Sequence, residues 1–221
     1  MRINQYIDHT LLKPEATLRD IEKLCMEAAD YRFYAVCVHS CHVLRARDLL
    51  IDSAGVRVCS VAGFPLGAMS SKAKLYEAEQ AVADGADEID MVLNLGWLKS
   101  GDTGKVLQEI NAIKKVIGSR ILKVIIETCY LNDKEKVLAS ILVADAGADF
   151  VKTSTGFGSG GATFHDIELM RAAVKGRIQL KASGGIKNFE VAKKYIDLGV
   201  TRIGTSSGIA IVEGYTSNES Y

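Results

Sequence analysis

The chain has 221 residues, and 48% of them are hydrophobic, which is enough apolar material for one domain with a sizeable core. Lysine plus arginine and aspartate plus glutamate number 27 each, and this balance argues against a protein that binds nucleic acid or an anionic membrane. No apolar run approaches the roughly 18 residues that a membrane-spanning helix needs, and the N-terminus lacks the apolar region of a secretory signal peptide. The five cysteines, an odd number at irregular spacing, indicate free thiols and predict a cytoplasmic protein.

Short β-rich runs alternate with amphipathic stretches from one end of the chain to the other. The predicted strands are 7–9, 35–38, 56–61, 88–93, 121–126, 150–153, 179–182 and 202–205. The predicted helices between them are 17–31, 42–53, 71–84, 102–117, 132–146, 164–174 and 188–198, and a final helical segment follows residue 208. Strands that alternate with helices pair in parallel, and eight of them predict a single (β/α)₈ barrel, or TIM barrel, over residues 1–221 with a flexible tail at 215–221. An open doubly wound sheet is the alternative.

Residues that favour helix ends support these boundaries. Thr17 with Asp20, and Asn132 with Glu135, have the spacing of capping boxes, in which two side chains bond to backbone amides at the start of a helix. Glycines follow several predicted helices at the position where the chain turns away from the helix, namely Gly55, Gly85, Gly118, Gly147, Gly176 and Gly199.

A weak internal repeat aligns three of the predicted strands. In each copy, a helix-ending glycine is followed five residues later by a mid-strand position, which is Asp90 in the fourth strand, Lys152 in the sixth and Gly204 in the eighth. Alternate strands of a barrel contribute to the same interior layer, so we expect Asp90 and Lys152 to point inward at similar height, with Gly204 leaving room beside them. The same spacing nominates Lys181 on the seventh strand and Lys123 on the fifth.

Two inward lysines beside one carboxylate are hard to explain by packing, although a structural ion pair between Lys152 and Asp90 is the alternative. A second ammonium about 5 Å away, at an effective dielectric constant of about 20, disfavours protonation of the first amine by roughly 3 kcal/mol. A desolvated lysine beside another cation is one way to activate a Schiff-base amine. We therefore predict that Lys152 is the nucleophile, that Lys181 favours its unprotonated form, and that Asp90 takes part in proton transfer.

Two glycine-rich turns, 183–187 and 204–208, follow the last two predicted strands. Barrels often bind phosphate at this place, where small residues let backbone N–H groups approach the anion. The turns favour a phosphorylated substrate, and ordinary strand-to-helix turns capped by serine are the alternative.

A group of possible metal ligands lies at Cys37, His39, Cys41 and His42. Their spacing matches no common zinc pattern, and we expect no metal here. A metal-dependent enzyme that uses this group is kept as an alternative.

Six stretches of the sequence resemble the deoxyribose-phosphate aldolase family. They are 8–14, 63–67, 88–92, the segments around Lys152 and Lys181, and 202–208, and they span nearly the whole chain. The resemblance implies a class I aldolase without metal or cofactor. Such an enzyme cleaves 2-deoxy-D-ribose 5-phosphate reversibly to D-glyceraldehyde 3-phosphate and acetaldehyde through an imine, here on Lys152.

By matching position, the resemblance also implies the residues that contact the substrate. Asp8 and Thr155 match positions near the sugar hydroxyls. Tyr221 matches a C-terminal tyrosine proposed to assist proton transfer in some relatives, and a frayed terminus is the alternative. The implied phosphate site consists of Gly156, Gly184, Gly185, Ser206 and Ser207.

The sequence departs from the family pattern at two positions near the implied phosphate site. Lys187 stands where many members carry arginine, so a bidentate contact would become a point-charge contact. Phe157 stands where some members have lysine, which would make the pocket less basic. Both changes bear on phosphate affinity and leave the expected chemistry intact.

Two further functional alternatives remain open at this point. One is another Schiff-base lyase or transaldolase on the same barrel, acting on a different sugar phosphate. The other is a non-catalytic protein that binds a phosphorylated ligand. The expected partner is a small phosphorylated sugar or aldehyde, and because relatives are often homodimers, a homodimer is also expected.

Overall fold

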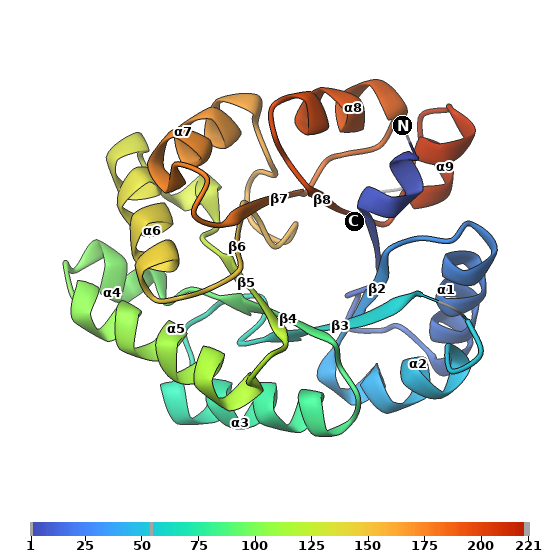
Figure 1. Ribbon diagram of the computed structural model, residues 1–221, viewed down its shortest axis with the longest axis horizontal. Coiled ribbons are helices and arrows are strands. Elements are labelled where there is room, and N and C mark those ends of the chain that lie inside the picture. Colours follow the sequence, from blue (N-terminus) through green and yellow to red (C-terminus); the bar gives the residue numbers. More distant parts are fainter. Residues whose placement is uncertain (1, 54, 219–221) are drawn as a thin grey trace.

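The computed structural model describes residues 2–53 and 55–218. Eight parallel strands follow one another around a closed barrel, and β1 pairs with β8 to complete the ring (Figure 1). The predicted (β/α)₈ barrel is therefore confirmed, and the open sheet is ruled out. The strands are β1 (Ile7–Thr10), β2 (Ala35–Val38), β3 (Arg57–Ala62), β4 (Glu88–Val92), β5 (Ile121–Ile125), β6 (Phe150–Lys152), β7 (Gln179–Ser183) and β8 (Arg202–Thr205).

Helices surround the ring of strands on the outside (Figure 1). They are α1 (Leu18–Asp30), α2 (Val43–Leu49), α3 (Ser71–Ala83), α4 (Leu95–Lys99), α5 (Thr103–Ile117), α6 (Asp133–Asp145), α7 (Phe164–Val174), α8 (Phe189–Asp197) and α9 (Gly208–Glu213), with short 3₁₀ turns η1 (Ile3–Tyr6), η2 (Ser40–His42) and η3 (Thr128–Tyr130). Within the described residues, no helix is long and apolar enough to cross a membrane.

Two helices differ from the prediction. Helix α2 ends at Leu49, before the predicted end at residue 53, because the chain then turns and Ser53 N–H donates to Leu50 O at 2.9 Å. Helix α4 was not predicted, since its five residues are too few to show a helical period. It begins where the Asn94 side chain accepts a hydrogen bond from Trp97 N–H at 3.2 Å.

The predicted helix ends are present in the structure. Thr17 with Asp20, and Asn132 with Glu135, form complete capping boxes. The N-cap side chain of such a box typically stabilises the folded protein by about 1 kcal/mol. The predicted helix-ending glycines all have positive φ angles, as the turn out of a helix requires.

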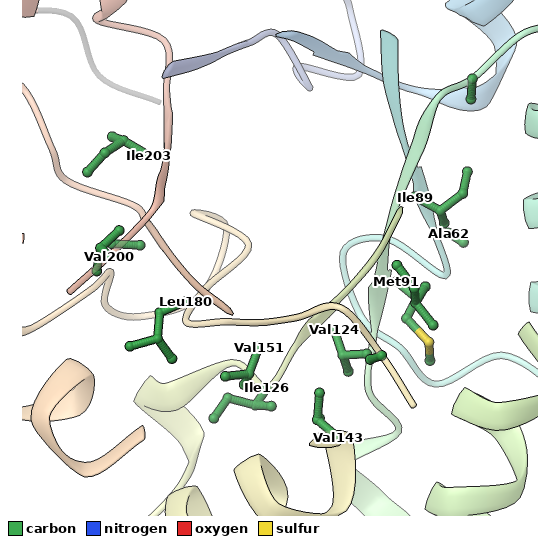
Figure 2. Packing of buried hydrophobic residues seen from close by; sticks show 14 of the residues in the cluster. Ala62, Ile89, Met91, Val124, Ile126, Val143, Val151, Leu180, Val200 and Ile203 are labelled. Carbon is green, nitrogen blue, oxygen red and sulfur yellow. The ribbon is translucent and has the colours of Figure 1, made fainter. Parts of the chain in front are cut away.

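The outer faces of the strands form the apolar core. Figure 2 shows Val124, Val151 and Leu180 on the outer side of their strands, turned toward the helices. They are almost completely buried and belong to one hydrophobic cluster that joins strands and helices. The molecule is therefore stabilised mainly by the layer between the barrel and its helices.

The inner faces of the same strands carry polar and charged side chains. The odd strands contribute Asp8, Cys59, Lys123 and Lys181 to one interior layer. The even strands contribute Cys37, Asp90, Lys152 and Gly204 to the next layer, which lies nearer the carboxyl ends of the strands. Reactive residues of TIM barrels lie at this end, so the inner face is the place to look for a site.

Candidate active site

Three lysine side chains converge on one carboxylate inside the barrel. Asp90 Oδ1 accepts a hydrogen bond from Lys123 Nζ at 2.7 Å. Its Oδ2 accepts hydrogen bonds from Lys152 Nζ and Lys181 Nζ, each at 2.8 Å. Lys123 and Lys181 are fully buried, whereas Lys152 is 3% exposed. The structure thus brings together the three side chains predicted to carry the chemistry, adds Lys123 to them, and leaves Lys152 the most accessible.

A second group of charges lies deeper in the barrel. Asp8 Oδ2 accepts a hydrogen bond from Lys181 Nζ, and Asp8 Oδ1 lies 2.9 Å from Arg202 Nη1. Glu88 Oε2 lies 2.9 Å from Arg202 Nη1 and 2.6 Å from Lys123 Nζ. Lys123 and Lys181 therefore link the two groups into one network of charges, which we call the interior ion network.

The interior ion network contains one more cation than anion. Because a buried charge without a counterion is costly, this imbalance favours one neutral lysine. Lys123 and Lys181 each contact at least two carboxylates, but Lys152 contacts Asp90, which it shares with both. Among the three lysines that contact Asp90, Lys152 therefore has the fewest carboxylate contacts that the described residues provide. The four cations are Lys123, Lys152, Lys181 and Arg202, and the three carboxylates are Asp8, Glu88 and Asp90.

The other members of the network are held in their charged forms. Burial by itself would raise the pKa of Asp90 and of Asp8, but the neighbouring cations lower both below their ordinary values. Burial would lower the pKa of Lys123 and of Lys181, but the neighbouring carboxylates raise both above their ordinary values. Lys181 is therefore a permanent positive charge at neutral pH.

Lys152 and Lys181 are close enough for that charge to matter. They are register partners on β6 and β7, and both amines lie 2.8 Å from the same oxygen of Asp90, so their separation is at most twice that distance. Gly204 makes space for Lys181, because a Cβ at residue 204 would lie 3.0 Å from Lys181 Cε.

Asp8 lies deeper than a position beside the sugar hydroxyls would suggest. Its side chain is fully buried, and its two oxygens pair with Lys181 and Arg202. These contacts favour a role for Asp8 in holding Lys181, in place of direct contact with a sugar.

A buried glutamate that the sequence did not single out holds the loop after β6. Glu127 follows β5 with a left-handed backbone (φ 49°), and its carboxylate accepts hydrogen bonds from Thr155 N–H at 3.2 Å and from Thr155 Oγ1. Burial raises the pKa of Glu127 above its ordinary value, although the hydrogen bonds from Thr155 lower it in part. The sequence could have pointed to Glu127 through its position just beyond the apolar strand β5, because barrels position reactive groups at the carboxyl ends of their strands.

The loops after β6, β7 and β8 are tied together at the mouth of the barrel. Gly184 has a φ of 87° and packs so closely on the β6–α7 loop that a Cβ would lie 2.8 Å from Gly161 Cα. Thr205 Oγ1 donates to Ile186 O at 2.7 Å, which joins the end of β8 to the loop after β7. These three neighbouring loops carry every residue of the predicted phosphate site, namely Gly156, Gly184, Gly185, Ser206 and Ser207.

The cysteines and histidines at 37–42 do not form one group in the structure. The Cys37 side chain is buried inside the barrel, whereas Cys41 is exposed. His39 Nε2 is bonded to Leu12 O at 2.9 Å. The thiol of Cys37 lies instead near Cys59 and Asp90, on the next two strands.

Tyr221 lies outside the described residues. The described part of the tail runs beside the predicted phosphate loops, because Ser217 N–H donates to Lys187 O at 3.1 Å. Tyr215 and Ser217 line a hollow together with Ser206 and Ser207. The tail is therefore directed along the mouth of the barrel as far as residue 218.

The sequence also matches known proteins over almost its entire length. The profile of the family described as DeoC/LacD family aldolase matches residues 2–213. The chain is similar to the deoxyribose-phosphate aldolase of Carboxydothermus hydrogenoformans, with 52% identity over 224 residues that cover 100% of this chain and 98% of the relative.

Solved structures give the same result. The chain is similar to the structure titled "QR15, an Aldolase", with a TM-score of 0.92, 44% identity and coverage of 96% of this chain and 94% of that one. It is also similar to the deoxyribose phosphate aldolase of Aeropyrum pernix, which is described as tetrameric, with a TM-score of 0.88, 35% identity and coverage of 96% and 89%. The resemblance noted in the sequence is thereby confirmed over the full barrel.

Proposed function

Because the chain belongs to the DeoC/LacD aldolase family, we propose that it is a class I aldolase that cleaves 2-deoxy-D-ribose 5-phosphate reversibly to D-glyceraldehyde 3-phosphate and acetaldehyde. The observation that carries this proposal is the position of Lys152. Lys152 is the most accessible of the three lysines that contact Asp90, and its amine lies beside that carboxylate. A neutral, desolvated amine beside other cations is what Schiff-base formation requires.

The reaction begins when the neutral Lys152 amine attacks the C1 aldehyde, and the adduct takes up one proton and loses water, which yields a protonated imine. The C2–C3 bond then breaks, and its electron pair moves toward the positively charged imine to form an enamine. The C3 hydroxyl loses its proton and becomes the aldehyde of glyceraldehyde 3-phosphate. Protonation of the enamine at C2 and hydrolysis of the imine release acetaldehyde and return the free amine.

Asp90 supplies the negative charge and the proton path beside the imine. Its low pKa keeps it a carboxylate, 2.8 Å from Lys152 Nζ, where it stabilises the positive charge of the iminium. A carboxylate at that distance also transfers protons to and from the intermediates, directly or through one water. Lys181, held protonated, keeps a positive charge beside Lys152 and Asp90.

The substrate lies over the interior ion network, with its phosphate at the loops after β6, β7 and β8. Thr155 faces the sugar. The Thr155 hydroxyl group donates a hydrogen bond to Glu127, which orients that hydroxyl group. The phosphate contacts come from Gly156, Gly184, Gly185, Ser206 and Ser207. Lys187, half-buried on the β7–α8 loop, adds a positive charge at this position.

The C-terminal tail closes over the mouth in this proposal, and Tyr221 assists proton transfer at C2 of the enamine. The hydrogen bond from Ser217 N–H to Lys187 O already holds the tail beside the phosphate loops. Three further residues extend the chain by at most about 10 Å. We expect Tyr221→Phe to slow the exchange of acetaldehyde C2 protons with solvent while imine formation persists, and equal exchange rates in both proteins would contradict this role.

The chain also forms a homodimer in the cytoplasm in this proposal. All five cysteines are free, which suits a reducing compartment. The relative from Aeropyrum pernix is described as tetrameric, so assembly differs within the family. Light scattering during size-exclusion chromatography measures the mass directly, and a monomer or a tetramer would contradict the homodimer.

The decisive experiment is borohydride trapping with acetaldehyde, followed by mass spectrometry of the intact protein and of its peptides. Wild type should gain one ethyl group on Lys152, and Lys152→Ala should gain none. Lys114→Ala is the matched control, because Lys114 lies on the outside of the barrel in helix α5. An adduct on Lys181 or Lys123 would overturn the assignment of the nucleophile, and a folded protein without any lysine adduct would overturn the Schiff-base mechanism.

A further inference from the structure

Two thiols and a carboxylate meet on the side of the interior ion network opposite Lys152 and Lys181. Cys37 on β2, Cys59 on β3 and Asp90 on β4 each present one ligand atom, and these three atoms all lie within 4.8 Å of one another. Cys59 Sγ lies 3.2 Å from Asp90 Oδ1. All three side chains are fully buried.

The barrel architecture brings these residues together. Cys37 and Cys59 are register partners on neighbouring parallel strands, and both side chains face inward. Leu12, Val61 and Phe64 pack around the thiols, so they lie in an apolar surrounding beside the charged network. A ligand set of this kind, with two soft thiolates and one carboxylate, suits zinc and cadmium far better than magnesium or calcium.

Binding of a divalent ion would leave the buried charge unchanged. The ion carries two positive charges into the barrel, and two thiol protons leave as the thiolates form bonds to the metal. Lys123 Nζ lies 3.3 Å from Cys59 Sγ, and its positive charge would repel the bound ion. Lys123 Nζ also lies 2.6 Å from Glu88 Oε2, so it can turn toward Glu88 when the ion coordinates Asp90 Oδ1.

We infer that Cys37, Cys59 and Asp90 form an inhibitory site for a thiophilic divalent cation, with Zn²⁺ as the natural ion. Three protein ligands leave a fourth position that water can fill. By coordinating Asp90, the ion neutralises part of the negative charge that stabilises the iminium on Lys152 and pairs with Lys181. An occupied site therefore suppresses imine formation. The bound ion acts as an off-switch and takes no part in the aldolase reaction.

Cadmium is the probe, because its bonds to thiolate give an absorption band in the ultraviolet that does not depend on enzyme activity. Protein that has been freed of metal with a chelator and kept reduced with a phosphine is titrated with Cd²⁺. Wild type should develop the band with an end point of one ion per chain. Cys37→Ser and Cys59→Ser should bind Cd²⁺ at least about 100-fold more weakly, since the loss of outer-shell contacts alone costs 10- to 100-fold.

Two control variants remove thiols outside the site. Cys25→Ser changes a buried thiol in helix α1, and Cys41→Ser changes an exposed one beside His42. Both should keep the band and its end point. Near-ultraviolet circular dichroism shows whether each serine variant keeps the native packing, and the alanine variant at the same position replaces any serine variant that does not.

Three results would overturn the inference. One is the absence of a band in wild type after prolonged incubation with equimolar Cd²⁺. The second is a band that persists in the Cys37→Ser, Cys59→Ser double variant, and the third is a band that disappears in Cys41→Ser, which would place the metal at the surface. Borohydride trapping on Lys152 is then measured with and without bound metal, and undiminished trapping at full occupancy would refute the off-switch while leaving the metal site in place.

Discussion

The two faces of the barrel strands differ as much as any two regions of this molecule. On β4, Ile89 points outward into the apolar cluster, while its neighbour Asp90 points inward to three lysines. The outer face follows the rule that buried apolar surface stabilises a fold, at roughly 25 cal/mol per Å². The inner face buries charges, which costs free energy unless each is paired. The comparison teaches that the apolar layer between the strands and the helices stabilises this barrel, whereas the charged side chains of the candidate site lie inside the ring of strands.

The inner face should be the more sensitive to conservative changes when activity is measured. Asp90→Asn keeps the shape of the side chain but removes the negative charge beside Lys152. We expect kcat/KM for cleavage of deoxyribose 5-phosphate to fall by about 10²- to 10⁴-fold, the usual contribution of a proton-transfer group. Activity within tenfold of wild type would show that Asp90 has only a structural role.

The deep part of the inner face should be the more sensitive when stability is measured. Arg202→Met removes the buried guanidinium that contacts both Asp8 and Glu88, and the free energy of unfolding should fall by about 3–5 kcal/mol. Arg177→Met is the matched control, because the pair of Arg177 with Asp145 is exposed to solvent and should contribute no more than about 1 kcal/mol. Equal losses in urea titrations of the two variants would contradict the comparison.

Lys181 should act on rate through its charge. Lys181→Met removes the ammonium that shares Asp90 with Lys152, and we expect kcat/KM at pH 7 to fall roughly 100-fold. Steady-state kinetics of the purified variant measure this loss, and activity within a few-fold of wild type would contradict a role for the charge of Lys181.

The smallest effect is expected on the outer face. Ile89→Val removes one methylene from the apolar cluster and should lower the free energy of unfolding by about 0.5–1.5 kcal/mol. Activity should remain within a few-fold of wild type, although the residue is adjacent to Asp90 in sequence. A large loss of kcat with little loss of stability would break the separation between the two faces.

Much of the fold could be predicted from local patterns. The alternation of strands and helices, the capping boxes at Thr17 and Asn132, and the helix-ending glycines all depend on neighbouring residues, which the sequence displays directly. Helix α4 escaped prediction because one short turn has no periodicity to detect. The early end of α2 escaped because the apolar residues after Leu49 form a turn that prolongs the helical pattern.

The sequence predicted which residues form the candidate site better than it predicted the hydrogen bonds and ion pairs that those residues make. The spacing from helix-ending glycines identified Asp90, Lys152 and Lys181, since barrel strands repeat the same local plan. This spacing did not identify Glu127 or Arg202. Glu127 matters through its contact with Thr155, and Arg202 through its contact with Glu88, and both partners lie far away in the chain.

The sequence by itself determined the class of fold, the family and the side chains proposed to carry the chemistry, because periodicity, turn residues and motifs are local properties. Only the tertiary structure decided how the charges are shared. It showed three lysines on Asp90, assigned Asp8 to Lys181, and brought Cys37 beside Cys59. The physical reason is that counterions and metal ligands are chosen by distance in space, and the closure of eight strands into a ring sets those distances.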